Sequence, residues 1–229
     1  MKNYLVSEDK IVQAIDMRSD LVNAVLYGIV DRGYVANGEI EKAARELING
    51  GADIIQLRAK GCEVSEIEEM ALRLVPICSA AGIPFVVNDF AEVAKRVDAD
   101  GVHIGQDDGS LSDVRKIVGD KMIVGRSTHS VEQAQQALVD GFDYIGFGPL
   151  FPTPTKKGRP GIGMENVSFV QSEVGNEIPV FCIGGIRRDN IKTVAQAGAR
   201  RIVVVSDLLT ADSIEEATAS AKQTFININ

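Results

Sequence analysis

A short segment in the first third of the chain alternates polar and apolar side chains. It reads QLRAK over residues 56–60 and follows an apolar run typical of a buried strand. Strand side chains alternate between two faces, so Gln56, Arg58 and Lys60 share one face. An arginine and a lysine on one face can clamp an anion such as a phosphate. The alternative is an internal salt bridge, and we favour the clamp because two like charges cluster here.

Carboxylates follow the next two apolar runs. Asp89 ends the sequence VVND at 86–89, and Asp108 ends HIGQDD at 103–108. Carboxylates beside a basic clamp suggest Mg²⁺ that bridges protein and phosphate oxygens. The alternative is that each aspartate only caps the helix that follows it. Together, and next to the clamp, the two aspartates favour the metal site.

A second anion site is predicted in the last third of the chain. The longest loop follows the apolar run 144–147 and reaches Pro160, and loops of this length in compact barrels are usually functional. It offers hydroxyl and ammonium donors from Thr153, Thr155 and Lys156. Gly184 and Gly185 follow one apolar run and Ser206 follows the next, a position where barrels often bind phosphate through backbone N–H groups. We therefore expect two phosphorylated small molecules to bind next to each other in one pocket. Lys156 is expected to belong to the site of Asp89 and Asp108.

The elements that must hold these residues are eight apolar runs alternating with helical patterns. Eight such units close most naturally into a (β/α)₈ TIM barrel, and an open doubly wound sheet is the alternative. The chain is predicted to consist of a helical extension over residues 1–22, with a helix near 8–17, and a single barrel domain over 23–229. The predicted strands are Ala24–Val30, Asp53–Leu57, Pro84–Val87, Gly101–Ile104, Met122–Gly125, Tyr144–Phe147, Val180–Ile183 and Ile202–Val205.

Composition excludes several classes of protein. The 229 residues carry a net charge of −8, which argues against a surface that binds nucleic acid. Three cysteines without a CxxC pair favour a reducing cytosol over a disulfide scaffold. No apolar run reaches the length of a membrane span and no signal peptide is evident, so we expect a cytoplasmic protein. A homo-oligomer is compatible with the sequence. Neither of the two histidines, His103 and His129, is assigned a proton-transfer role.

In these motifs, the chain resembles the thiamine-phosphate synthase family. The matching segments keep the family's order and spacing from about Leu26 onward, and they are QLRAKG (56–61), VVND (86–89), DGVHIGQDD (100–108), GRSTHS (125–130), DYIGFGPLFPTPTKK (143–157), IGGI (183–186) and VVVS (203–206). The resemblance implies a transferase that joins 4-amino-5-hydroxymethyl-2-methylpyrimidine diphosphate to a thiazole phosphate. The products are thiamine phosphate and pyrophosphate, with CO₂ where the thiazole carries a carboxylate.

The resemblance also assigns residues to the two substrates. The implied pyrimidine-diphosphate contacts are Gln56, Arg58, Lys60, Asn88, Ser127 and Lys156. The implied thiazole-phosphate contacts are Thr153, Thr155, Gly185, Val205 and Ser206, and the implied Mg²⁺ ligands are Asp89 and Asp108. The implied catalytic residues are Arg58, Lys60, Lys156 and Ser127.

The implied mechanism is dissociative loss of pyrophosphate, which needs no protein nucleophile. Two other functions compete with it. One is a thiazole tautomerase-like paralogue on the same barrel, which would generally lack the metal carboxylates and the diphosphate clamp. The other is a non-catalytic sensor of a phosphorylated ligand. The presence of both aspartates and all three basic residues favours the synthase.

Overall fold

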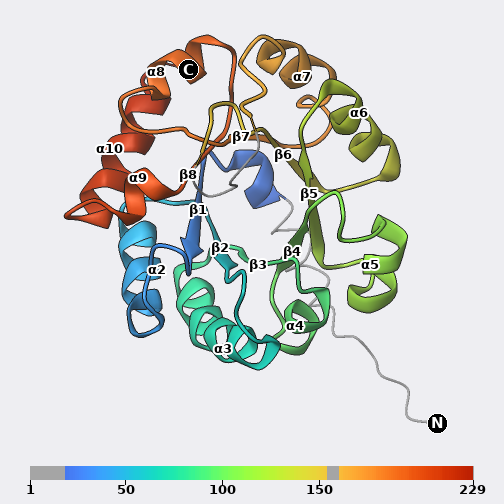
Figure 1. Cartoon of the computed structure of the whole chain (residues 1–229), viewed down its shortest axis with the longest axis vertical. Helices are drawn as coiled ribbons and strands as arrows, with labels where there is room; N and C mark the ends of the chain where they lie inside the picture. The colour runs from blue at the N-terminus through green and yellow to red at the C-terminus, as the bar shows by residue number, and fades with distance from the viewer. Residues whose placement is uncertain (1–18, 154–159, 229) are drawn as a thin grey trace.

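Eight parallel strands close into a barrel in the order of the chain, β1 to β8 (Figure 1). The computed structural model describes residues 19–153 and 160–228, so the helix expected near 8–17 lies outside the described residues. The (β/α)₈ prediction is confirmed. The strands are β1 Leu26–Asp31, β2 Ile54–Arg58, β3 Phe85–Asn88, β4 Gly101–Ile104, β5 Ile123–Thr128, β6 Tyr144–Phe147, β7 Val180–Ile183 and β8 Ile202–Val204.

Helices surround the barrel in the positions that the sequence predicts. They are α2 Ile40–Asn49, α3 Val64–Ala81, α4 Ala91–Arg96, α5 Leu111–Val118, α6 Val131–Asp140, α7 Val167–Glu173, α8 Ile191–Gln196 and α10 Ile214–Ile226. Two further helices are short, η1 Asn37–Glu39 directly before α2 and α9 Ser206–Leu209 directly after β8, and of these α9 was not predicted. Among the described helices, none is long and apolar enough to cross a membrane.

Local sequence sets where α6 begins. The hydroxyl of Ser130 accepts a hydrogen bond from the backbone N–H of Gln133 at 3.3 Å, so Ser130 is the N-cap of the helix. The side chain of Gln133 reaches back to the backbone N–H of His129, at 2.8 Å, rather than to that of Ser130. The cap therefore also fixes the residue that follows β5, at the edge of the candidate site.

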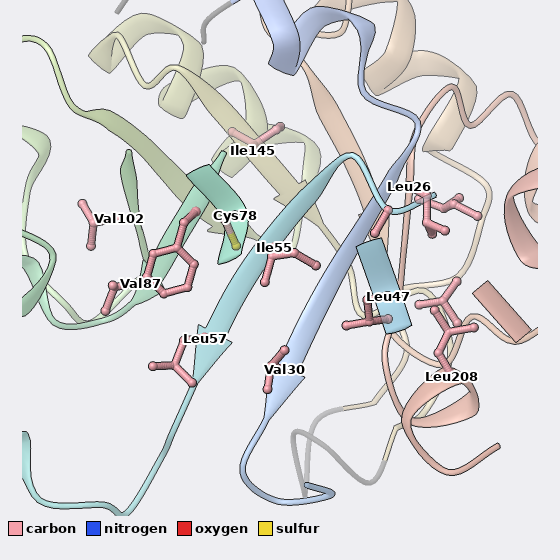
Figure 2. Close-up of a cluster of buried hydrophobic side chains, with 14 of the residues drawn as sticks. Leu26, Val30, Leu47, Ile55, Leu57, Cys78, Val87, Val102, Ile145 and Leu208 are labelled. Carbon is pink, nitrogen blue, oxygen red and sulfur yellow. The ribbon is translucent and has the colours of Figure 1, made fainter. Parts of the chain in front are cut away.

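Two apolar layers make up the core. The outer layer packs between strands and helices, and Figure 2 shows Ile55 and Leu57 of β2 among its side chains, together with Leu47 of α2. Because these two side chains point outward, Gln56 and Arg58 point to the inside, as strand alternation predicts. Fully burying one such aliphatic side chain contributes about 1.5–3 kcal/mol.

The inner layer fills the barrel axis and differs in chemistry. It contains two tyrosines, Tyr27 and Tyr144, together with Phe181. Phe181 meets both tyrosine rings edge to face, with ring centroids 5.4 and 5.7 Å apart. Residues 19–23 are helical, and Leu21, which is 1% exposed, packs into this inner layer. The end of the predicted N-terminal extension thus belongs to the core of the barrel.

Candidate active site

The main pocket is formed at the carboxyl ends of the strands, and each of the eight strands contributes to its lining. It encloses about 880 Å³, open solvent at its mouth included. Eight of the residues predicted from the sequence line it, namely Gln56, Arg58, Asn88, Ser127, Thr153, Gly185, Val205 and Ser206. Thr155 and Lys156 lie outside the described residues. Lys60, Asp89 and Asp108 lie in the loops that directly follow β2, β3 and β4.

Arg58 makes an ion pair inside the pocket. Its Nη1 donates to Oδ2 of Asp31 at 2.7 Å, and the two side chains are 15% and 1% exposed. The other carboxylate oxygen of Asp31 accepts from the backbone N–H of Gly33 at 2.8 Å. The salt bridge considered as an alternative is therefore present, and its effect is to hold the guanidinium at the pocket wall. Because an arginine has five N–H donors, this pairing is compatible with binding an anion as well.

Opposite charges also meet between the ends of β2 and β3. The ammonium of Lys60 lies 2.7 Å from Oδ2 of Asp89. Burial raises the pKa of Asp89, and the nearby carboxylate of Asp108 raises it further, whereas Lys60 lowers it. Asp89 also adopts a left-handed backbone conformation with φ of 68°. Strained backbone of this kind is common at functional sites.

The loop that carries Asp108 is fixed from two sides. Oδ2 of Asp108 accepts from the backbone N–H of Gly105 at 2.7 Å. Arg126, on the outward face of β5, donates to the carbonyl oxygens of Gly109 at 2.7 Å and Gln106 at 3.2 Å. Its guanidinium lies 5.3 Å from the ring centroid of Phe142. Arg126 thus supports the carboxylate loop from outside the barrel.

The glycines after β7 are required by the loop that follows β6. Gly184 and Gly185 have φ of 98° and 66°, a region that L side chains rarely adopt. A Cβ on Gly185 would lie 2.6 Å from Cβ of Phe151. The backbone N–H of Phe151 donates to the carbonyl of Gly184 at 3.0 Å. The two glycines therefore let the long loop pack directly on the end of β7, beside Thr153.

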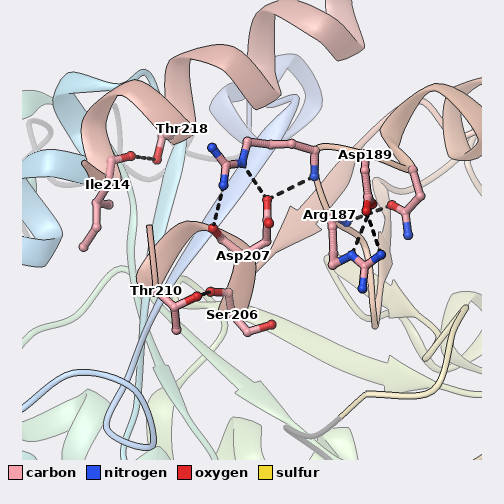
Figure 3. Close-up of polar contacts among 9 residues, drawn as sticks. Arg187, Asp189, Ser206, Asp207, Thr210, Ile214 and Thr218 are labelled. Atoms are coloured by element: carbon pink, nitrogen blue, oxygen red, sulfur yellow. Dashed lines mark hydrogen bonds and ion pairs between the residues drawn. The ribbon is translucent and has the colours of Figure 1, made fainter. Parts of the chain in front are cut away.

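A pair of charged residues joins the ends of β7 and β8. Asp207, in α9, accepts from the backbone N–H of Arg188 at 3.0 Å and from its Nε at 2.8 Å (Figure 3). The same figure shows Ser206 at the start of α9, where its carbonyl accepts from the hydroxyl of Thr210 at 2.8 Å. These contacts fix Ser206 relative to the loop that carries Gly185.

Sequence reasoning missed part of the pocket. Tyr27, His103 and Tyr144 line it from β1, β4 and β6, and Asp31 lines it from the end of β1. The tyrosines lie in apolar runs that predict core residues. The signal that could have found them is the need of a buried phenol for a hydrogen-bond partner. Inward-facing polar groups on several strands together indicate a ligand rather than a dry core.

A closed parallel barrel with ionic groups and glycines at its carboxyl face is the arrangement of TIM-barrel enzymes that act on phosphorylated small molecules. Comparison with known proteins narrows the class. The family model described as thiamine monophosphate synthase matches residues 26–208. The thiamine-phosphate synthase of Shouchella clausii is 41% identical over 84% of this chain and 92% of that protein.

Two further relatives agree with this match. The thiamine-phosphate synthase of Saccharopolyspora erythraea is 42% identical over 90% of this chain and 95% of that protein. The structure of thiamine phosphate pyrophosphorylase from Pyrococcus furiosus superposes with a TM-score of 0.80 at 32% identity, over 92% of this chain and 98% of the other. The chain belongs to the thiamine-phosphate synthase family, and it is a transferase of thiamine biosynthesis. The synthase prediction is confirmed.

Proposed function

We propose that the two sides of the pocket bind the two substrates of thiamine phosphate synthesis. The pyrimidine diphosphate binds at the ends of β2 to β5, through Gln56, Arg58, Lys60, Asn88 and Ser127, with Lys156. The thiazole phosphate binds at the ends of β6 to β8, through Thr153, Thr155, Gly185, Val205 and Ser206. The observation that carries this proposal is that one pocket is lined by residues of both sets.

Asp89 and Asp108 would hold Mg²⁺ together with oxygens of the diphosphate. Their fit to the ion rests on the electrostatic interaction between them. The two carboxylates lie close enough for Asp108 to raise the pKa of Asp89, a repulsion that a cation would relieve. Among the described residues, no group of three or more His, Cys, Asp or Glu side chains could hold a metal. A pair of carboxylates suits Mg²⁺, which is usually bound by one or two carboxylates plus substrate phosphates and water.

The basic residues of the first side assist departure of the leaving group. The bond between the pyrimidine methylene carbon and the diphosphate oxygen breaks, and its electron pair leaves with pyrophosphate. Arg58, Lys60 and Lys156 stabilise the charge that develops on that oxygen, which is the usual effect of fixed donors in a sheltered site. Bound Mg²⁺ would supply further neutralisation of the same charge. The aminopyrimidine ring stabilises the methylene cation that remains.

The second side places the nucleophile. The thiazole nitrogen donates its lone pair to the methylene carbon and forms the new C–N bond, so no protein nucleophile is needed. With a carboxylated thiazole, CO₂ also leaves. Ser206 and the backbone around Gly185 hold the thiazole phosphate, and orientation of this kind lowers the entropic part of the barrier. The Arg188–Asp207 pair, with its 2.8 Å contact, supports this geometry because it joins the two loops.

Product formation from defined substrates tests the proposal. The protein is incubated with Mg²⁺ and both substrates, with either substrate omitted, and with plain or carboxylated thiazole phosphate. We expect thiamine phosphate and pyrophosphate in equal amounts, only when both substrates and the metal are present. Isomerisation of the thiazole without condensation, or binding without turnover, would contradict it.

The cytoplasmic location, a homo-oligomeric state and the domain boundary after residue 22 remain predictions.

A further inference from the structure

A row of hydrogen bonds crosses the inside of the barrel beneath the pocket and ends at Ser127. Nε2 of Gln56 donates to the hydroxyl of Tyr27 at 2.9 Å, and that hydroxyl lies 3.0 Å from the hydroxyl of Tyr144. The Tyr144 hydroxyl lies 3.1 Å from Nδ1 of His103, whose Nε2 lies 3.0 Å from Oγ of Ser127. The first four residues are at most 9% exposed, so these contacts are sheltered from water.

The direction of this row follows from counting protons. The amide nitrogen of Gln56 can only donate, so the oxygen of Tyr27 accepts. Burial raises the pKa of both tyrosines, so each keeps its single hydroxyl proton. In the described part of the chain, the other hydrogen-bond partner of Tyr27 is Tyr144, so Tyr27 donates to it. Tyr144 then uses its own proton to donate to His103.

The hydrogen bond from Tyr144 fixes the protonation state of the His103 imidazole. A nitrogen that accepts from Tyr144 carries no proton, so neutral His103 is protonated on Nε2. That nitrogen donates to Oγ of Ser127 at 3.0 Å. The hydroxyl proton of Ser127 is then directed away from the imidazole. Ser127 lines the pocket, where its hydroxyl can donate to a ligand oxygen.

We propose that Tyr144 and His103 are positioning residues that present the Ser127 hydroxyl as a hydrogen-bond donor to the diphosphate of the pyrimidine substrate. This inference rests on the proposed assignment of Ser127 to that substrate. A phosphate oxygen is an acceptor only, so a serine that offered a lone pair there would repel it. The row of buried partners removes that unfavourable orientation before the substrate binds.

Nitrogen-15 NMR of the ligand-free protein tests the direction of the row. The chain has only two histidines, so both imidazoles can be assigned. At a pH where the rings are neutral, we expect His103 to be protonated on Nε2. His129 is an internal control, because its Nδ1 faces the carbonyl oxygen of Gly148 and must carry the proton there. A proton on Nδ1 of His103 would overturn the inference and leave the proposed function intact.

A double-mutant cycle tests whether Tyr144 acts through Ser127. Ser127→Ala should raise the KM for the pyrimidine diphosphate about tenfold, as for one hydrogen bond to a charged group. Tyr144→Phe removes only a hydroxyl and should raise the same KM about three- to tenfold. If Tyr144 acts through Ser127, the double variant is no worse than Ser127→Ala alone. Effects that multiply would mean that Tyr144 only stabilises the barrel, and the proposal would fail.

Tyr27→Phe is the matched control for loss of a buried phenol hydroxyl. In this variant Tyr144 can still donate to His103, so the His103 proton should stay on Nε2. If the His103 tautomer changed as much in Tyr27→Phe as in Tyr144→Phe, Tyr144 would not be the residue that orients His103, and the proposal would be contradicted. Circular dichroism identifies a variant that does not fold. In that case the His103 tautomer of the wild-type protein still decides the direction of the hydrogen bonds. Wild-type protein that forms no thiamine phosphate would instead overturn the proposed function.

Discussion

The two sides of the pocket are built by different means. At the ends of β2 to β4, charged side chains meet in ion pairs, Arg58 with Asp31 and Lys60 with Asp89, each at 2.7 Å. At the ends of β6 to β8, backbone shape dominates the pocket lining, with Gly184 and Gly185 in conformations of positive φ, and the Arg188–Asp207 ion pair is not part of that lining. One side therefore depends on charge and the other depends on how closely the backbone can approach.

This difference suits two different tasks. A leaving diphosphate gains charge during the reaction, so fixed charges on its side lower the barrier. A phosphate that only anchors the second substrate changes little, and hydroxyl and backbone N–H donors suffice for it. Substitutions on the two sides should accordingly change different kinetic constants, kcat on the diphosphate side and KM on the side of the anchoring phosphate.

Neutralising the carboxylates should have the largest effect. Asp89→Asn and Asp108→Asn should each reduce kcat about 1,000-fold or more, because loss of a metal ligand costs several kcal/mol in the transition state. Steady-state kinetics across a Mg²⁺ series measures this. Asp107→Asn is the matched control, because Asp107 directly precedes Asp108, its carboxylate is exposed and it has no assigned role. Near-normal turnover at low Mg²⁺ in either variant would show that the residue is not a metal ligand.

Removing one donor from each side should separate the two tasks. Lys156→Ala should lower kcat about 100-fold, as expected for one lost electrostatic donor. Ser206→Ala should raise the KM for the thiazole phosphate roughly tenfold and leave kcat almost unchanged. Kinetics with each substrate varied in turn measures both. A Lys156→Ala variant that changed only the thiazole-phosphate KM would place Lys156 on the other side.

The backbone side can be tested with two glycines that have nearly equal φ. Gly185 and Gly82 have φ of 66° and 67°, but only Gly185 is crowded, with Cβ of Phe151 2.6 Å from a built Cβ. Gly82→Ala should lower the free energy of unfolding by about 1 kcal/mol, from backbone strain alone. Gly185→Ala should lower it further and raise the thiazole-phosphate KM roughly tenfold, because the loop must shift. If the two variants had the same free energy of unfolding and the same thiazole-phosphate KM, the close approach of Gly185 to the loop at Phe151 would have no special role.

The smallest effect concerns stability and pH. The folded-state pKa of Asp89 is raised above its ordinary value of 3.8, chiefly by burial, so its ionisation destabilises the fold as pH rises above that value. Ligand-free Asp89→Asn should therefore unfold about 1–3 °C higher than wild type near neutral pH. Asparagine also tolerates the positive φ. Calorimetry should show equal Tm values for Asp89→Asn and wild type at a pH below the ordinary pKa of Asp89. A lower Tm of the variant at neutral pH would mean that the Lys60 ion pair stabilises the fold by more than burial of the carboxylate destabilises it.

The sequence predicted the barrel because its signals are local. Eight apolar runs have the length and covered character of parallel strands, and three of them, 101–104, 144–147 and 180–183, match the observed bounds. Alternation along residues 56–58 also told correctly which side chains point inward. The strand ends then gathered most of the candidate site at one face. Helix α9 was missed because its four residues carry no periodicity.

What the sequence by itself determined is the succession of strands, their inward faces and the residues at their carboxyl ends, since each depends on neighbours along the chain. The tertiary structure alone decided which inward residues meet. Tyr27 and Tyr144 are 117 residues apart and their hydroxyls lie 3.0 Å apart. Arg58 forms an ion pair with Asp31 of the adjacent strand, at 2.7 Å. Alternation assigns a side chain to a face, but its partner across the barrel depends on strand tilt and closure, which set the distances across the axis.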